Sequence, residues 1–195
     1  MKFLGVYDYT VILTYLSLVS ALTGMTLASG GRFTAAVLCL LFSGLCDAFD
    51  GTVARSKKDR TEDEKAFGIQ LDSLCDVVSF GVFPAMLCFH MGVSGVLGRI
   101  ILALYCVCGV MRLGYFNVQE GKRQQVEETG NKSFRGIPIT SASAIIPLTY
   151  CLRFVVSQRA FPIILQVVLL LMSFFFVLDF HVPKPDVKAL FSRHN

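Results

Sequence analysis

The sequence predicts an all-α polytopic membrane protein with six transmembrane helices. Of its 195 residues, 54% are hydrophobic and only 16% are charged, whereas a soluble domain has roughly 25% charged residues. The charges lie between long apolar runs. Each run has about 20 residues, which is the length that a bilayer-crossing helix requires. The composition therefore excludes an ordinary soluble domain, and the small net charge of +4 gives no indication of nucleic-acid binding.

Six apolar runs follow one another along the chain. The first has no charged residue, the second has two aspartates near its end, and the third is preceded by two more. The fourth and fifth are each interrupted by one arginine, and the sixth is uncharged up to Leu178. We expect a single membrane-embedded domain over residues 1–195, with spans at about 9–31, 33–54, 70–98, 100–119, 136–158 and 160–180.

Lysines and arginines between the spans indicate the orientation of the chain. Basic residues accumulate in loops that stay in the cytoplasm. Here they gather near the N-terminus, after the second and fourth spans and in the tail, whereas the opposite side has only Arg32, Arg99 and Arg159. We therefore expect an integral protein of a bacterial or archaeal-type cell membrane, with both termini and the two long loops in the cytoplasm.

Four aspartates lie where the second span reaches the cytoplasmic face and the third returns from it: Asp47, Asp50, Asp72 and Asp76. Spacings of three and four residues place each pair on one helix face. Ionisable residues inside spans are costly and usually functional, and four clustered carboxylates repel one another unless cations neutralise them. Oxygen ligands without histidine or cysteine favour Mg²⁺, Mn²⁺ or Ca²⁺. Two such ions are a common arrangement for phosphoryl chemistry.

Small residues and an arginine accompany these aspartates. Gly51 and Ala54 share a helix face with the first pair, and Gly68 lies one turn before the second pair. Small side chains let a bulky ligand approach the backbone, although they also permit tight helix packing in membranes. Arg55 supplies a cation suited to a phosphate group.

The stretch from Asp47 to Asp76 resembles the signature of the CDP-alcohol phosphotransferases. It contains D-A-F-D-G-T-V-A-R and then G-I-Q-L-D-S-L-C-D, which agrees with D-x-x-D-G-x-x-A-R and G-x-x-x-D-x-x-x-D at every fixed position. The resemblance implies a six-helix dimeric membrane enzyme with two divalent cations, Mg²⁺ or Mn²⁺, at the cytoplasmic face. It implies that Asp76 is both a metal ligand and the general base. It further implies metal ligation by Asp47, Asp50 and Asp72, and CDP-lipid binding by Asp47, Gly51, Ala54, Arg55, Gly68 and Asp72.

Two later segments resemble the branch of that family that uses serine, the CDP-diacylglycerol–serine phosphatidyltransferases. They are M-R-L-G-Y-F-N at 111–117, where the branch has R-L-A-R-F-N, and F-R-G-I-P at 134–138, where it has F-[KR]-G-[LI]-P. Gly-Tyr in place of Ala-Arg removes one arginine. This resemblance implies that CDP-diacylglycerol and L-serine give phosphatidylserine and CMP. The residues expected to hold the acceptor are Arg112, Asn117, Lys132 and Arg135.

Several alternatives remain open. Glycerol 3-phosphate or inositol phosphate as acceptor would call for a denser basic pocket, which the same residues could form. Arg112 could instead have a structural role in the membrane, and Arg135 could serve only to set the topology. A channel or transporter for divalent cations would also use aspartates, but its site should lie near the bilayer midplane, whereas these lie at one face beside the phosphate-suited Arg55. The sequence therefore favours an enzyme.

Overall fold

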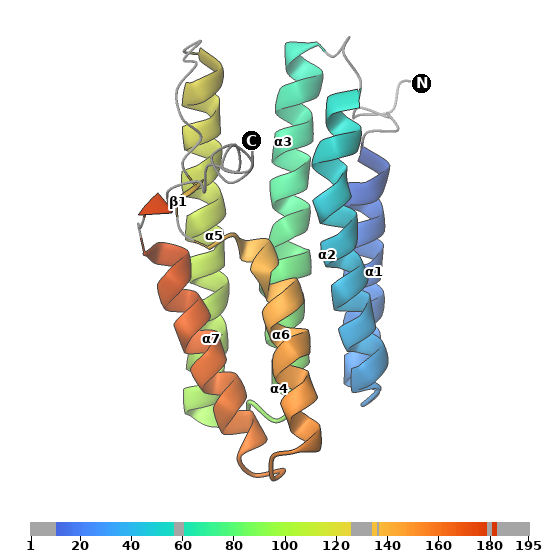
Figure 1. Ribbon diagram of the computed structural model, residues 1–195, viewed down its shortest axis with the longest axis vertical. Helices are drawn as coiled ribbons and strands as arrows, with labels where there is room; N and C mark the ends of the chain where they lie inside the picture. Colours follow the sequence, from blue (N-terminus) through green and yellow to red (C-terminus); the bar gives the residue numbers. More distant parts are fainter. Residues whose placement is uncertain (1–10, 57–60, 126–133, 136, 179–180, 183–195) are drawn as a thin grey trace, which may run out of the picture.

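Six helical columns run side by side in the part of the chain that the structure describes (Figure 1). This structure is a computed structural model, and the residues it describes are 11–56, 61–125, 134–135, 137–178 and 181–182. The first three columns are α1 (Ile12–Ser29), α2 (Phe33–Ser56), and a composite of α3 (Glu62–Asp76), a π-helix (Val77–Val82) and α4 (Phe83–His90). The others are α5 (Gly95–Gln125), α6 (Ala142–Cys151) between two 3₁₀ turns (Ile139–Ser141 and Leu152–Phe154), and α7 (Phe161–Val177).

The lengths of the columns agree with a polytopic membrane protein. Among the described residues, four stretches are long and apolar enough to cross a bilayer, namely Ile12–Ser29, Phe33–Asp50, Ala66–His90 and Gly95–Gln119. The last two columns, Ile139–Phe154 and Phe161–Val177, are shorter. At about 1.5 Å per residue a helix of 17 residues extends about 26 Å, slightly less than the about 30 Å of a hydrocarbon core. The chain is an integral membrane protein, and its count of helical columns matches the prediction.

The third and fourth spans differ from the predicted boundaries at the turn between them. The third column ends at His90 instead of residue 98, and α5 begins at Gly95 instead of residue 100. Gly92 and Gly95 have positive φ angles of 110° and 78°, which glycine adopts without steric cost. Because this turn is itself apolar, hydropathy does not mark it.

Two helices also continue into polar sequence beyond the predicted spans. α3 begins at Glu62, where Thr61 and Glu64 form a capping box: the Glu64 amide donates to the Thr61 hydroxyl and the Thr61 amide donates to the Glu64 carboxylate. Such reciprocal bonds satisfy amides that a helix start leaves unpaired. α5 runs on to Gln125 through glutamine, lysine and arginine, which are good helix formers.

A minimal β-pair is the one departure from the predicted all-α class in the described residues. β1 (Phe134–Arg135) pairs antiparallel with β2 (His181–Val182), so that Arg135 lies opposite His181. Segments of two residues carry no periodic signal from which a strand could be predicted.

The bundle has apolar side chains on its outer surface and small polar ones between its helices. Leu148 is 74% exposed, as expected where lipid is the solvent. Inside, the hydroxyl of Ser43 donates to the carbonyl of Ser17 (3.0 Å), and the hydroxyl of Ser17 lies 3.3 Å from the carbonyl of Ser43. Gly24 faces Phe83, whose ring a Cβ atom at that position would overlap. Close approach at small residues is typical of helix packing in membranes.

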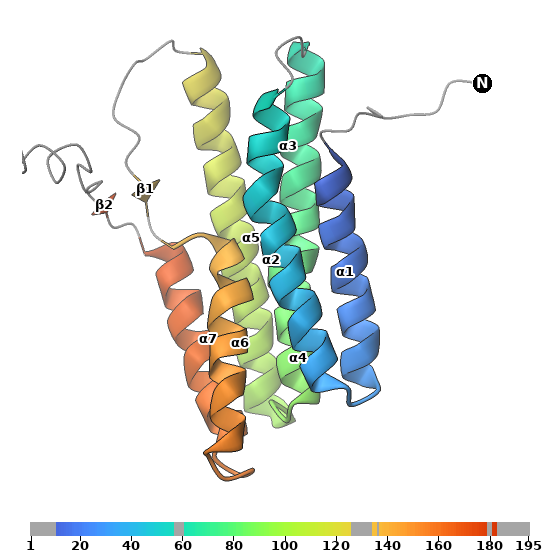
Figure 2. The same ribbon diagram turned by 45° about the vertical axis from the view of Figure 1, so that its right-hand side comes forward.

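The columns end at different heights. In both views α3 and α5 extend beyond α6 and α7 at the end of the bundle where α2 ends and α3 begins (Figures 1 and 2). α1 and α2 form a hairpin on one side, whereas α5 packs against α7 on the other. The aspartates lie on the side toward this extended end: Asp47 and Asp50 are in the second half of α2, which ends there, and Asp72 and Asp76 are no farther than the middle of the column that starts there with α3.

Candidate metal centre and active site

Three carboxylates from two helices meet at the extended end of the bundle. Asp47 projects from α2, and Asp72 and Asp76 project from successive turns of α3. One oxygen from each carboxylate lies within 4.8 Å of the others. Asp47 and Asp72 are partly buried, so these charges are only partly screened by solvent. The structure thus brings together one aspartate of the first predicted pair and both aspartates of the second.

Asp50 has a different environment. It is buried, and one of its oxygens accepts a hydrogen bond from the hydroxyl of Thr14 on α1. Thr14 is buried as well, so the contact fixes the carboxylate against α1. Among the described residues, Asp50 is not one of the three whose oxygens meet. A threonine within an apolar run gives no sequence signal for this role, so Thr14 could not be predicted from the sequence.

The residues expected to bind the CDP group continue the same helices. Gly51, Ala54 and Arg55 follow Asp50 in the last turns of α2, and the side chains at 51–55 lie outside the described part of the structure. Gly68 is partly buried on α3, one turn before Asp72. All four positions therefore lie on the two helices that carry the aspartates.

Asn117 contacts the helix that carries two of the carboxylates. Its side-chain oxygen accepts a 2.9 Å hydrogen bond from the hydroxyl of Ser73, the residue that follows Asp72. This bond joins α5 to α3 at the level of the aspartates. Asn117 is thus an acceptor candidate whose side chain contacts the sequence neighbour of a predicted metal ligand, Asp72.

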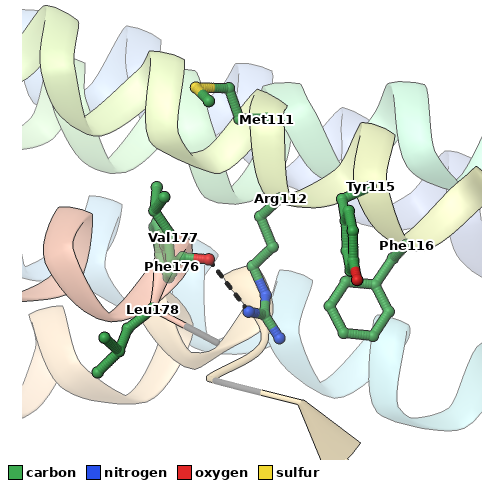
Figure 3. A pocket seen from close by; sticks show the side chains of 7 residues that line it. All are labelled: Met111, Arg112, Tyr115, Phe116, Phe176, Val177 and Leu178. Atoms are coloured by element: carbon green, nitrogen blue, oxygen red, sulfur yellow. Dashed lines mark hydrogen bonds between the residues drawn. The ribbon is translucent and has the colours of Figure 1, made fainter. Parts of the chain in front are cut away.

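Arg112 faces another direction. It is five residues from Asn117, which corresponds to about 140° around the helix axis. The guanidinium is buried between α5 and α7, donates a 3.2 Å hydrogen bond to the carbonyl of Phe176, and lies 4.6 Å from the ring centre of Phe116 (Figure 3). The pocket around it is lined by Met111, Arg112, Tyr115, Phe116, Phe176, Val177 and Leu178.

The other two acceptor candidates are less defined. Lys132 lies outside the described residues, and Arg135 is in β1 opposite His181. Of the four candidates, only Arg112 and Asn117 have side chains that the structure describes, and these two point to different sides of α5. The four residues share a position near one membrane face in the sequence, but five residues of α5 separate Arg112 from Asn117 by about 140° around the helix.

A π-helix begins directly after Asp76 and extends to Val82. π-turns in long helices frequently occur at functional sites. Ser79 in this segment is buried, and its hydroxyl lies 3.4 Å from that of Ser17 on α1. The helix that carries Asp72 and Asp76 thus changes its winding next to the carboxylates, and polar contacts with α1 accompany the change.

Comparison with known proteins identifies the family. A family model described as CDP-alcohol phosphatidyltransferase matches residues 9–179. The chain is 33% identical over 160 residues to a CDP-diacylglycerol–serine O-phosphatidyltransferase of Saccharomyces cerevisiae, an alignment that covers 78% of this chain and 56% of the relative. It is 35% identical over 163 residues to an archaetidylserine synthase of Methanothermobacter thermautotrophicus, covering 83% of this chain and 66% of that relative.

A third relative, a CDP-diacylglycerol–serine O-phosphatidyltransferase of Bacillus subtilis, is 33% identical over 120 residues, covering 59% of this chain and 61% of the relative. The chain therefore spans about half to two thirds of the length of these curated relatives. No solved structure matches it. Because the family model covers most of the chain, including all four aspartates, the chain belongs to the CDP-alcohol phosphatidyltransferase family.

Proposed function

We propose that this chain transfers the phosphatidyl group of CDP-diacylglycerol to the hydroxyl of L-serine, giving phosphatidylserine and CMP. The observation that carries the proposal is the convergence of the Asp47, Asp72 and Asp76 carboxylates in a chain of this family. The names of the three relatives described above all refer to a product that contains serine. One of them refers to an archaetidyl instead of a phosphatidyl group, so the lipid part of the donor is the more variable element.

The carboxylates have the chemistry that a hard divalent cation requires. Their donor atoms are all oxygen, and hard cations such as Mg²⁺ and Mn²⁺ prefer oxygen ligands. We propose two ions, Mg²⁺ or Mn²⁺, held by Asp47, Asp72 and Asp76 together with Asp50, whose orientation Thr14 fixes. When bound, such ions would neutralise the diphosphate of the donor and stabilise the charge that develops on the departing CMP.

The reaction itself requires a base and a positioned acceptor. In the proposed step the carboxylate of Asp76 accepts the proton of the serine hydroxyl. The serine oxygen then forms a bond to the phosphorus that carries the diacylglycerol, and the bond from this phosphorus to the oxygen of CMP breaks. Phosphatidylserine and CMP are thereby formed without an additional reactant.

The donor and acceptor would occupy different parts of the extended end. We propose that the CDP group is bound by residues on successive turns of α2 and α3. They are Asp47, Gly51, Ala54, Arg55, Gly68 and Asp72. The bond between Asn117 and Ser73 brings an amide group of α5 to the helix that carries Asp72 and Asp76.

A serine carboxylate requires a cationic partner, and we assign this role to Arg112, which lines the pocket between α5 and α7, because a guanidinium can bind a carboxylate with two hydrogen bonds. From the sequence we also assign Lys132 and Arg135, which precede α6 along the chain, to the acceptor. The pocket has one described cation in its lining, which suits a monoanionic carboxylate better than the dianionic phosphate of glycerol 3-phosphate or inositol phosphate.

We also propose that the aspartates and both termini face the cytoplasm, that residues 1–195 form one catalytic domain, and that the protein is a homodimer. The distribution of lysine and arginine supports the orientation, and membership of the family supports the dimer. Fluorescent-protein and alkaline-phosphatase fusions at the C-terminus test the orientation, because the first fluoresces when cytoplasmic and the second is active only outside. Native mass spectrometry tests the dimer.

The decisive experiment uses the purified full chain in detergent with CDP-diacylglycerol and Mg²⁺ or Mn²⁺. CMP release is followed with L-serine, glycerol 3-phosphate, myo-inositol or inositol phosphate as separate acceptors, beside the Asp76→Asn variant. We expect CMP release that depends on L-serine and is abolished in the variant. Release only with another acceptor would contradict serine as the substrate, and Mn²⁺ binding without CMP release from any acceptor would contradict the enzyme assignment itself.

A further inference from the structure

The end of the bundle opposite to the aspartates is purely cationic in its described segments. The turns at 30–34, 91–99 and 151–160 contain no aspartate or glutamate. They contain four arginines: Arg32, Arg99, Arg153 and Arg159. All four arginines are exposed, and the described residues of these turns offer them no carboxylate.

Two of these arginines line one pocket between the start of α2 and the end of α6. Arg32 and Arg153 face it together with Thr34 and Tyr150. The hydroxyl of Tyr150 lies 2.9 Å from the Thr34 hydroxyl, and this contact joins α6 to α2. The pocket is therefore built from residues far apart in the sequence that a hydrogen bond holds together.

The guanidinium of Arg153 is held in place by aromatic rings. It lies 5.1 Å from the ring centre of Phe33 and donates a 3.4 Å hydrogen bond to the hydroxyl of Tyr150. A guanidinium has five N–H donors in a fixed plane, and in the described structure Arg153 has no carboxylate partner. An arginine oriented in this way is suited to bind the oxygens of a phosphate with two hydrogen bonds.

The surroundings of the pocket indicate that its ligand is part of a lipid. Phe154 and Val155, which follow Arg153, are 77% and 86% exposed. Phe33 is 14 residues before Asp47 on α2, which corresponds to about 21 Å along the helix. The pocket thus lies near the opposite membrane boundary, with apolar side chains directed outward beside the cations. At this level the phosphate groups of phospholipids are the anions that membrane arginines meet.

We propose that Arg32 and Arg153 form a binding site for the phosphate group of a membrane phospholipid in the leaflet opposite to the aspartates. The bound lipid completes the contact between α2 and α6, with its phosphate at the two guanidinium groups and its acyl chains against Phe154 and Val155. This proposal does not depend on the proposed enzymatic activity, because none of these residues belongs to the candidate active site.

The test is native mass spectrometry of the full chain, titrated in detergent with phosphatidylglycerol. We expect the Arg32→Gln/Arg153→Gln double variant to bind the lipid about tenfold more weakly, since charge-assisted hydrogen bonds are lost. The matched control is Arg99→Gln, which removes one positive charge from the same end of the bundle but outside this pocket. It should bind phosphatidylglycerol as the unchanged protein does.

Three further measurements make the outcome specific. Diacylglycerol, which has no phosphate, should not bind at this site, and inorganic phosphate at millimolar concentration should not displace the lipid. Tyr150→Phe keeps both charges but removes the hydroxyl that holds Arg153, so we expect an intermediate loss of binding even if the double variant does not fold.

Two results would overturn the proposal. One is equal weakening by Arg99→Gln, and the other is unchanged binding in both the double variant and Tyr150→Phe. Displacement by inorganic phosphate would show an anion site without lipid specificity and would overturn it too.

Discussion

The hydroxyl of Tyr105 on α5 donates a 2.6 Å hydrogen bond to the backbone carbonyl of Phe80, inside the π-helix that follows Asp76. Both residues are fully buried. A buried carbonyl needs a donor, and here a side chain of the neighbouring column supplies one. The thiol of Cys106 makes a similar contact with the carbonyl of Gly81, at 3.5 Å. α5 thereby stabilises the changed winding of the helix that carries Asp76.

Tyr105→Phe should destabilise the protein and weaken its metal binding. The ring is retained, but the Phe80 carbonyl loses its donor, which costs about 1–3 kcal/mol of unfolding free energy. We expect a lower melting temperature in detergent and a several-fold higher half-saturating Mn²⁺ concentration, measured by electron paramagnetic resonance. Tyr15→Phe, at a position 39% exposed, is the control and should change neither. Mn²⁺ affinity equal to that of the unchanged protein would show that the π-helix does not position Asp76.

The contact between Thr14 and Asp50 can be tested with a pair of substitutions. Thr14→Val keeps the shape but removes the donor, whereas Thr14→Ser keeps the hydroxyl. A hydrogen bond to a charged group contributes about 1.5–3 kcal/mol, so the valine variant should bind Mn²⁺ or release CMP at least about tenfold less efficiently. The serine variant should stay within about threefold of the unchanged protein. If both variants behave alike, the hydroxyl does not matter and only the packing between α1 and α2 does.

Removal of divalent cations should abolish activity and be reversible. With excess EDTA we expect no CMP release, and Mn²⁺ in excess of the chelator should restore it. Asp47→Asn and Asp72→Asn should each lower Mn²⁺ affinity by at least about tenfold, because even partners of metal ligands contribute about 10–100-fold. Glu64→Gln is a suitable control, since it removes a carboxylate from the first turn of α3. Full activity in the presence of EDTA would contradict the metal site.

Much of the fold was predictable because a membrane requires long apolar helices, and nearly all described elements of this chain are helices. The meeting of Asp47 with Asp72 and Asp76 was predictable as well. Helical spacing puts each pair on one face, and the antiparallel course of consecutive spans brings the faces to the same membrane boundary. Where the boundaries were wrong, as at Gly95, the turn is as apolar as the helices that it joins.

The remaining features depend on contacts that no single segment encodes. The bond from Thr14 to Asp50 joins residues 36 positions apart. The bond from Arg112 to the Phe176 carbonyl joins residues 64 positions apart, and a hydropathy pattern does not say which columns are neighbours. The acceptor candidates were grouped by depth in the membrane, and rotation around α5 separates Arg112 from Asn117.

Arg112→Gln should reduce the discrimination between serine and ethanolamine, which is serine without its carboxylate. If the guanidinium binds that carboxylate, the ratio of kcat/KM for serine to that for ethanolamine should fall by at least about tenfold. Arg99→Gln, at the opposite end of the bundle, should leave the ratio unchanged. A lower melting temperature with an unchanged ratio would mean that Arg112 serves only to hold the carbonyl of Phe176.

Gly24→Ala should destabilise the bundle, because the added Cβ atom would overlap the ring of Phe83 on α4. Phe83 is completely buried, so that its ring can move aside only by displacing neighbouring side chains. Overpacking of this kind costs about 1–3 kcal/mol, which should lower the melting temperature in detergent.

Gly114→Ala on α5 is the matched control, because nothing lies within 4 Å of a Cβ atom there. Alanine is the better helix former by about 1 kcal/mol, so the control should be neutral or slightly stabilising. Equal melting temperatures for the two variants would show that the contact between α1 and α4 is looser than the structure indicates.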